Sequence, residues 1–282
     1  MNTIAEVRPS PIAGRWYAGD PASLAREVDA FLGEVKLPPL KGEVLAIIAP
    51  HAGHRYSGRT AAHAFAAIIG QAYPRVAVIA PLHGYHSAAL LTSAHLRYAT
   101  PLGEIPVDRA AIDQLRGILI EKGNVSLEAV ACDDEHSLEI ELPFLQRTLA
   151  APFSLLPVMV RSRDWKTLNP LGKALAEVAG QSKTLLVASS DLSHFYPEST
   201  AKVLDREMLA RIVSLNPESV LAAETEGAGF ACGAAAITAV MIAALELGAN
   251  AAQLLHHSTS ADETGDPTSV VGYGAVAILK RD

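Results

Sequence analysis

The sequence has few cysteines, an excess of acidic over basic residues and no apolar run long enough to cross a bilayer. Its 282 residues include two cysteines, Cys132 and Cys232, so nothing resembles a disulfide framework. Lysine and arginine number 23 against 30 aspartate and glutamate, giving a formal net charge of −7. Without a long basic run, nucleic-acid binding is not expected. The longest apolar stretch, Cys232 to Ala244, is shorter than the ~18–20 residues of a membrane-spanning helix.

Several familiar signatures are also missing. There is no HExxH, CxxC, GxSxG or GxxxxGK, which argues against zincin, zinc-finger, serine-hydrolase and P-loop nucleotide-binding functions. The N-terminus lacks the basic and apolar regions of a secretory signal. We therefore expect a soluble, cytoplasmic protein that binds neither nucleic acid nor membrane.

What the chain does contain is an alternation of buried strands and helices. Short apolar runs at Val44–Ala49, Arg75–Ala80 and Thr184–Ser190 have the length and composition of strands buried on both faces. Amphipathic helical segments separate them, and no linker or low-complexity segment interrupts the chain. This pattern predicts a single α/β domain over residues 1–282, a three-layer αβα structure around a mixed, mostly parallel sheet.

Some local predictions are specific. Pro21–Leu32 has helical spacing of apolar residues, with Asp20 as its N-cap. Leu90–Tyr98 is predicted to be one strand. Ser154–Val160 is predicted to be an edge or bulged strand, because Pro157 cannot donate a ladder hydrogen bond.

Histidines follow the predicted strands in a repeated pattern. The first two strands each end in proline with a histidine close behind, at His51 and His83, and the third is followed by Asp191 and His194. Ligands of open α/β sheets bind beyond the carboxyl ends of strands, so these side chains are expected to meet there. The alternatives are ordinary ones: loop histidines that only form hydrogen bonds, and an Asp191 that caps a helix.

Cys232 precedes a predicted helix, whose N-terminus should favour the thiolate. We expect Cys132, which precedes two aspartates, to be structural. Two imidazoles with a third ligand and open positions are typical of non-haem iron, and thiolate and imidazole also suit copper and zinc. His136 follows acidic residues and is either part of a site or an ordinary first-turn residue. The remaining histidines without a flanking pattern are predicted to be ordinary: His63, His95, His256 and His257.

Sequence blocks in this order and spacing resemble the Memo family, whose prokaryotic members are called AmmeMemoRadiSam system protein B. The blocks include RPSPIAGRWYAGDPASL, APHAGHRYSG, DDEHSLEIELPFLQ, SSDLSHF and CGAAAI, and the resemblance covers about Arg8 to Leu279. It implies a fold similar to the LigB-type class III extradiol dioxygenases, which use non-haem Fe(II). The sequence departs from the family at Gly84, where a second histidine is frequent, and at His54, where an aromatic residue is common.

The resemblance also implies a site and partners. It places metal ligands at His51, His83 and Cys232. It places Asp191 and His194 beside the pocket, with Glu135 and His136 nearby. A radical-SAM protein and an AMMECR-type protein are the implied partners.

Three functions fit these residues. The first is a redox or dioxygenase-like reaction on a small organic substrate at Fe(II), or at copper, with catalytic acids or bases among Asp191, His194, His136 and Glu135. The second is a non-enzymatic protein that binds phosphopeptides in the same cleft, for which Arg55 and Arg59 are the nearest arginines. The third is a metal-free hydrolase with Cys232 as nucleophile and His51 or His194 as base.

Overall fold

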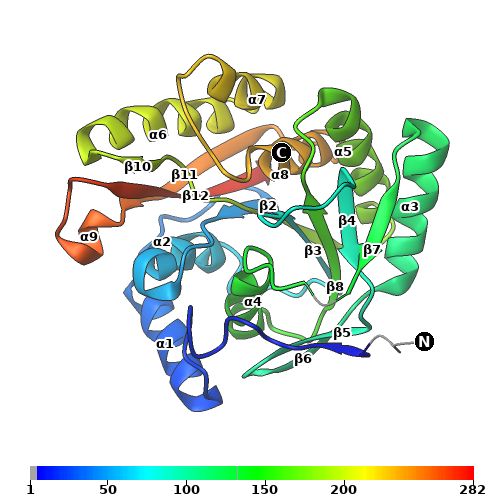
Figure 1. Cartoon of the computed structure of the whole chain (residues 1–282), viewed down its shortest axis with the longest axis horizontal. Helices are drawn as coiled ribbons and strands as arrows, with labels where there is room; N and C mark the ends of the chain where they lie inside the picture. Colours follow the sequence, from blue (N-terminus) through cyan, green and yellow to red (C-terminus); the bar gives the residue numbers. More distant parts are fainter. Residues whose placement is uncertain (1–4, 132) are drawn as a thin grey trace.

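A computed structural model of the chain describes residues 5–131 and 133–282. Within this part of the chain a nine-stranded mixed sheet has the order β10-β12-β2-β9-β3-β8-β4-β7, with β11 paired to β12 (Figure 1). Its strands are β2 (Glu43–Ala49), β3 (Arg75–Pro81), β4 (Leu90–Ser93), β7 (Leu127–Val130), β8 (Ser154–Val160), β9 (Thr184–Ser189), β10 (His194–Tyr196), β11 (Ala251–Thr259) and β12 (Val270–Lys280).

The centre of this sheet is parallel and almost wholly apolar. Strands β2, β9, β3 and β8 run in the same direction, with Ala46 opposite Leu186 and Ala77 opposite both Leu186 and Leu156. Their side chains are buried on both faces, which explains why these strands contain continuous apolar runs instead of alternating patterns. On one side β12 pairs antiparallel with β2, and on the other side β4 pairs antiparallel with β8. The predicted α/β class and mixed sheet are confirmed.

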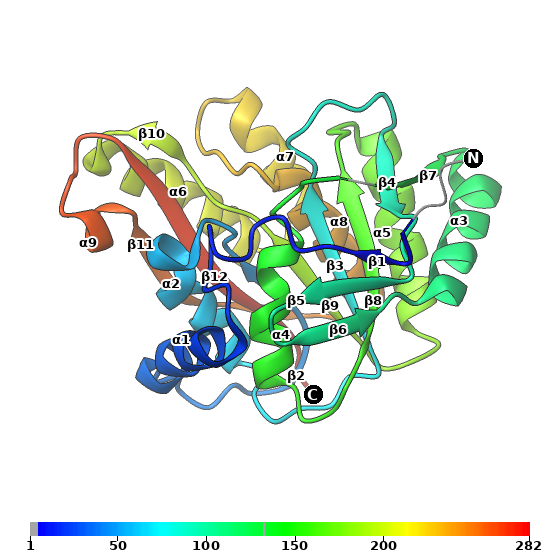
Figure 2. The same ribbon diagram turned by 60° about the horizontal axis from the view of Figure 1, so that its bottom comes forward.

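Helices cover both faces of the sheet (Figures 1 and 2). One face carries α2, which packs on β2 and β12 and contacts α1 and α4. The other carries α8 on β2, β9 and β3, with α5 and α3 outside it, while α6 packs on β10, β11 and β12. The helices are α1 (Pro21–Glu34), η1 (Glu139–Glu141), α2 (His54–Ala66), α3 (Arg109–Gly123), α4 (Leu142–Thr148), α5 (Trp165–Ala179), α6 (Glu198–Val213), α7 (Pro217–Thr225), α8 (Ala234–Glu246) and α9 (Ala261–Thr264).

A small second sheet crosses one side of the domain near α4 (Figure 2). It has the order β1-β5-β6 and comprises β1 (Val7–Arg8), β5 (Arg97–Thr100) and β6 (Gly103–Pro106). The single strand predicted over Leu90–Tyr98 is therefore wrong: β4 ends at Ser93 and β5 joins the other sheet. The Asp20 cap of α1 is confirmed, because its side chain accepts a hydrogen bond from the Ser23 amide.

The prediction that Pro157 marks an edge strand is also wrong. Strand β8 lies between β3 and β4, inside the sheet. Only its last two residues, Met159 and Val160, pair with β4, so no ladder acceptor on β4 depends on the N–H that Pro157 lacks. The Thr92 hydroxyl donates to the Pro157 carbonyl instead, at 2.7 Å.

Two further sequence predictions concern membranes and cysteine. No helix in the described residues combines the length and the apolar character needed to cross a membrane. Cys132, predicted to be structural, lies outside the described residues.

Candidate metal centre

The parallel strands deliver the predicted side chains to one edge of the sheet. Strand β2 ends two residues before His51 and β3 two residues before His83, while β9 ends two residues before Asp191. Because parallel strands have their carboxyl ends at the same edge, these residues lie together although the chain separates them widely. The strand-end pattern thus correctly predicted that His51 and His83 meet.

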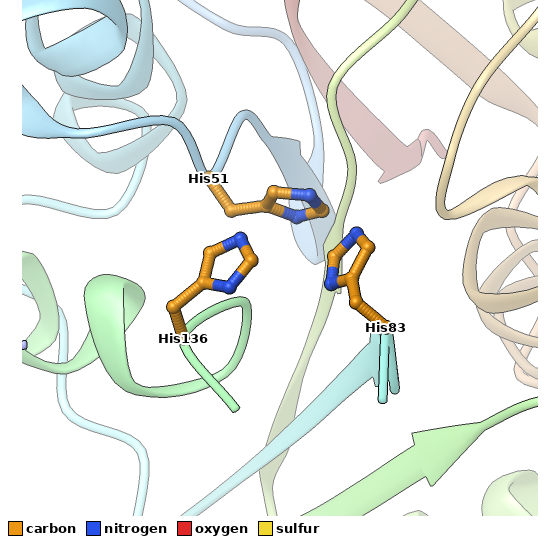
Figure 3. A group of neighbouring side chains, drawn as sticks. All are labelled: His51, His83 and His136. Atoms are coloured by element: carbon orange, nitrogen blue, oxygen red, sulfur yellow. The ribbon is translucent and has the colours of Figure 1, made fainter. Parts of the chain in front are cut away.

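Three imidazoles form the core of the site (Figure 3). One ring nitrogen from each of His51, His83 and His136 lies within 4.8 Å of the others. The ring centroids are 5.3 Å apart for His51 and His83, 5.5 Å for His51 and His136, and 4.7 Å for His83 and His136. Figure 3 shows the three rings turned toward a common space. The sequence placed His136 only nearby, whereas its ring belongs to the cluster.

The orientation of His51 is determined by a serine. The Ser189 hydroxyl donates its one hydrogen to the Ser137 carbonyl, at 2.6 Å. It therefore accepts from Nδ1 of His51, which lies 2.9 Å away. This tautomer leaves the Nε2 lone pair of His51 free for a ligand. Ser189 was not predicted, although it opens the SSD segment at the end of β9.

A single carboxylate organises the other two imidazoles. Oε1 of Glu135 lies 2.9 Å from Nδ1 of His83 and 3.2 Å from Nδ1 of His136. The same carboxylate accepts the backbone amides of His83, His136 and Ser137. A carboxylate that accepts Nδ1–H leaves Nε2 free, which is the usual arrangement behind metal-bound histidines.

Burial and hydrogen bonding act on these groups in different directions. Burial opposes ionisation of Glu135, but hydrogen bonds from His83 and Ser137 hold its pKa well below the ordinary range. The bond to Glu135 raises the pKa of His83. Burial lowers the pKa of His136 to about 4 and that of His51 well below its ordinary value. His51 and His136 are therefore neutral near pH 7, the form that binds metal.

Cys232 lies against the imidazole of His51. Its Sγ is 3.1 Å from the free Nε2, so the thiol donates to the ring. We expected the start of α8 to favour thiolate, but burial prevails and raises the pKa of the thiol well above its usual value. A metal ion replaces this proton when a thiolate ligand forms. Cys232 therefore reaches the site as a protonated thiol hydrogen-bonded to a candidate ligand.

Asp191 and His194 lie on the side of the site nearest Cys232. Oδ1 of Asp191 accepts the backbone amides of His51 and Ala52, at 2.8 and 3.2 Å, and so holds the loop that carries His51. Burial raises the pKa of Asp191 to about 7. Nδ1 of His194 donates to the Leu192 carbonyl, at 2.8 Å, and burial lowers the pKa of this histidine. His194 is thus a third neutral imidazole, with its proton on Nδ1 and a lone pair on Nε2.

An aromatic pocket of about 480 Å³ adjoins the cluster. Trp16 connects the two, because its ring lies 4.1 Å from that of His136 and also lines the pocket. Phe195 contributes from the rim: its backbone has a φ of 65°, and the residue is 75% exposed. A bulky residue in this left-handed conformation is strained, and such strain is concentrated at functional sites. Arg15, Ala52, Tyr56 and Tyr273 also line this pocket.

The histidines predicted to be ordinary are absent from the three-imidazole cluster. The ring of His54 packs against Tyr17, Phe31 and Phe144. This is the position at which the family that the sequence resembles commonly has an aromatic residue. A Cβ at Gly84 would meet no atom within 4 Å, so no close packing in the described residues requires glycine there.

The chain is similar to known proteins over nearly its whole length. The family model described as Memo-like protein matches residues 8–277. A MEMO1 family protein of Methanococcoides burtonii is 33% identical over 278 residues, covering 96% of this chain and 100% of the relative. Those of Nitrosopumilus maritimus and Aquifex aeolicus are each 30% identical and cover 97% of this chain, with 100% and 99% of the relatives covered.

Proposed function

The chain belongs to the Memo-like protein family, and we propose that it holds one iron or copper ion for a redox or dioxygenase-like reaction on a small organic substrate. His51, His83 and Cys232 bind the ion in this proposal, and His136 lies against it. The observation that carries the proposal is the common orientation of the imidazoles. Hydrogen bonds engage Nδ1 of His51 and His83, so that each Nε2 carries a lone pair; that of His51 accepts from the Cys232 thiol, the third proposed ligand.

The donor set fits a redox metal. Imidazole and thiolate ligands bind iron and copper in preference to hard cations such as magnesium and calcium, which favour oxygen ligands. A bound ion would supply Lewis acidity and a site for one-electron chemistry. The neutral imidazoles of His136 and His194 are placed to accept a proton from a substrate that reaches the cluster. The aromatic pocket beside Trp16 is the place where that substrate would bind.

A metal-free hydrolase is favoured by one contact, the 3.1 Å separation of Cys232 Sγ and His51 Nε2. Two observations weigh against it. Burial raises the pKa of the thiol, whereas a nucleophilic cysteine needs a lowered one. The backbone amides of Cys232 and Gly233 donate to the Asp191 carbonyl and to Ser190, so neither is free to stabilise an oxyanion.

A phosphopeptide-binding role is less well supported by the arginines named from the sequence. Arg59 forms ion pairs with Glu34 and Glu263, and Arg55 lies over the Tyr56 ring. Arg15 is the arginine that lines the aromatic pocket. Binding of phosphotyrosine to metal-free protein, with the affinity lost in Arg15→Gln, would favour this role over the redox proposal.

Metal content after anaerobic purification tests the proposal directly. We expect near-stoichiometric iron or copper in the wild type, and loss of the metal in His51→Ala, His83→Ala and Cys232→Ser. A protein that contains no metal and also fails to bind added Fe(II) or copper would refute the proposal. His63→Ala is the matched control, since His63 lies outside the cluster and its Nδ1 donates to the Arg59 carbonyl.

Cobalt substitution decides which third side chain is a ligand. If Cys232 binds the metal, Co(II)-loaded protein shows an intense near-ultraviolet sulfur-to-metal band that is lost in Cys232→Ser and kept in His136→Ala. If His136 is the ligand, the wild type lacks this band and His136→Ala loses Co(II). The second result would replace Cys232 by His136 in the proposed ligand set.

The family resemblance also motivates a cytoplasmic location and two partners, a radical-SAM protein and an AMMECR-type protein. Affinity purification of the chain from its own cells, with proteins identified by mass spectrometry, tests both partners. Fractionation of the same cells tests the location.

A further inference from the structure

Strand β10 separates two cavities that reach the site from different sides. Successive side chains of a strand point in opposite directions. Phe195 accordingly lines the aromatic pocket, whereas its neighbours His194 and Tyr196 line a second cavity of about 200 Å³. We call this second space the thiol cavity, because Cys232 is one of its walls.

The thiol cavity is small, and its wall combines apolar with polar side chains. Leu192, Phe230 and Ala231 form part of its wall, and the ring of Phe230 stacks on that of Tyr196 with centroids 5.8 Å apart. Cys232 is partly exposed, and it is the side chain through which this cavity meets the candidate metal centre. Its thiol hydrogen-bonds to His51, so a molecule in the cavity would lie next to a candidate metal ligand.

An ion pair lies at the border of the thiol cavity. Arg163, in the segment before α5, pairs with Glu224 on α7, and both residues line the cavity. Both side chains are substantially exposed, 49% for Arg163 and 35% for Glu224. Their charges compensate each other, so the border does not select strongly for an ion of either sign.

We infer that the thiol cavity is a second entrance to the site, through which a small uncharged molecule reaches Cys232 without passing the aromatic pocket. Its volume of about 200 Å³ is below the range of ordinary ligand pockets, roughly 300–1,000 Å³, so it admits molecules of a few atoms. Dioxygen is the molecule of this class that the proposed reaction would consume, and in that respect the inference rests on the proposed function. The organic substrate would then occupy the aromatic pocket at the same time.

Labelling of the Cys232 thiol tests the route independently of any metal. The experiment uses full-length Cys132→Ser protein treated with a chelator, so that Cys232 is the remaining cysteine. Iodoacetamide is the small uncharged reagent and fluorescein maleimide the bulky one, and the labelling rates are measured at one pH by mass spectrometry. Arg163→Ala widens the thiol cavity and Phe195→Ala widens the aromatic pocket. The Arg163 side chain is 49% exposed and Phe195 is 75% exposed, so neither substitution removes a buried side chain. The two variants are therefore a matched pair.

We expect iodoacetamide to label Cys232 in the parent protein while the bulky maleimide reacts several-fold more slowly. Arg163→Ala should accelerate the maleimide reaction several-fold, and Phe195→Ala should leave both rates unchanged. Acceleration by Phe195→Ala alone would overturn the inference, because the thiol would then be reached from the aromatic pocket. A maleimide rate that is the same in the parent protein, Arg163→Ala and Phe195→Ala would also overturn the inference, because local unfolding would then limit access to the thiol.

A third variant fills the route instead of widening it. Ala231→Leu adds side-chain volume to the wall of the thiol cavity and should slow iodoacetamide labelling several-fold in a protein with an unchanged circular dichroism spectrum. An unchanged rate would contradict the inference. Metal content is measured in a separate experiment, so a labelling result that contradicts the second entrance does not contradict the metal proposal. Conversely, a protein that contains no metal can still be used to test the second entrance by labelling.

Discussion

Glu135 holds His83 through both its ring and its backbone. One carboxylate oxygen accepts from Nδ1 of His83 at 2.9 Å, and the other accepts from its amide at 2.5 Å. The glutamate side chain is almost inaccessible to solvent, so this contact is shielded from competing water. The carboxylate fixes both the position of His83 and the nitrogen that it presents to a ligand.

Replacing this carboxylate should weaken metal binding without removing a ligand. Glu135→Gln keeps the shape of the side chain but loses the charge, and partners of this kind typically contribute about 10–100-fold to metal affinity. We expect a loss of that size in Co(II) titrations followed by absorbance. Glu104→Gln, on the exposed strand β6, is the control and should bind Co(II) like the wild type. Equal affinity in Glu135→Gln would show that the contact is only structural.

The buried Asp191 should make stability fall as the pH rises. Burial raises its pKa from 3.8 to about 7, so the folded protein holds a proton that the unfolded chain releases between these values. The folded state therefore loses stability through this window, by up to about 4 kcal/mol for this one group. Asp191→Asn cannot ionise, so its stability relative to the wild type should be greater at pH 8 than at pH 5. Urea unfolding of chelator-treated protein at both pH values measures the difference, and a constant difference would contradict the assignment.

Arg8 connects the first strand of the chain to the loop that carries the site. Its guanidinium is 1% exposed and donates to Asp133, to Glu139 and to the Glu135 carbonyl, with the shortest contacts at 2.7, 2.6 and 2.8 Å. Lysine keeps the charge but cannot make this fork of bonds. We expect Arg8→Lys to destabilise the protein by about 2–3 kcal/mol and to lower Co(II) affinity about tenfold, because Glu135 and His136 lose their support.

The control for this prediction is Arg75→Lys. Arg75 also makes a partly buried ion pair, to Asp108 at 2.8 Å, but it lies at the start of β3, away from the strand ends that carry the site. The Arg75→Lys variant should be less stable than the wild type but should bind Co(II) with the same affinity. If both variants lost Co(II) affinity equally, the effect of Arg8 would be one of general stability.

His54 offers a route to a more stable protein. Its Nδ1 contacts Glu27 at 2.8 Å, but its buried Nε2 has no hydrogen-bond partner. The ring packs among aromatic side chains, so phenylalanine fits the surroundings chemically. Removing an unsatisfied buried nitrogen should outweigh the lost bond to Glu27, and we expect His54→Phe to raise the free energy of unfolding by about 1 kcal/mol. Thermal unfolding followed by circular dichroism measures it, and a lower melting temperature would mean that the Glu27 contact dominates.

The sequence predicted the features that depend on local pattern. Apolar runs located β2, β3 and β9, and their common direction brought His51 and His83 together at one edge. The sequence did not predict the position of the His136 ring, because the loop before η1 is held by Arg8, more than a hundred residues away. The raised pKa of Cys232 was also missed, since burial depends on packing around α8 and not on the helix start alone.

Strand β11 was missed for a different reason. Its sequence, AAQLLHHST, has neither a continuous apolar run nor a strict alternation, and a bulge between Leu254 and His256 breaks its register. Its two histidines face different helices: His256 contacts Thr60 on α2, and His257 contacts Asp205 on α6. The strand is specified by these long-range contacts, which a local pattern does not contain.

The pairing of β12 with β2 has a consequence for biosynthesis. Ala277, near the end of the chain, is the register partner of Ile47, in the first strand of the large sheet. During translation β2 emerges before β12, and this edge of β2 has no partner until β12 has also been synthesised. The nascent chain therefore carries an open strand edge while the residues between β2 and β12 are made, which exposes it to mispairing with other chains. Since β2 leads directly to His51, ion loading at this site is expected to follow the synthesis of β12.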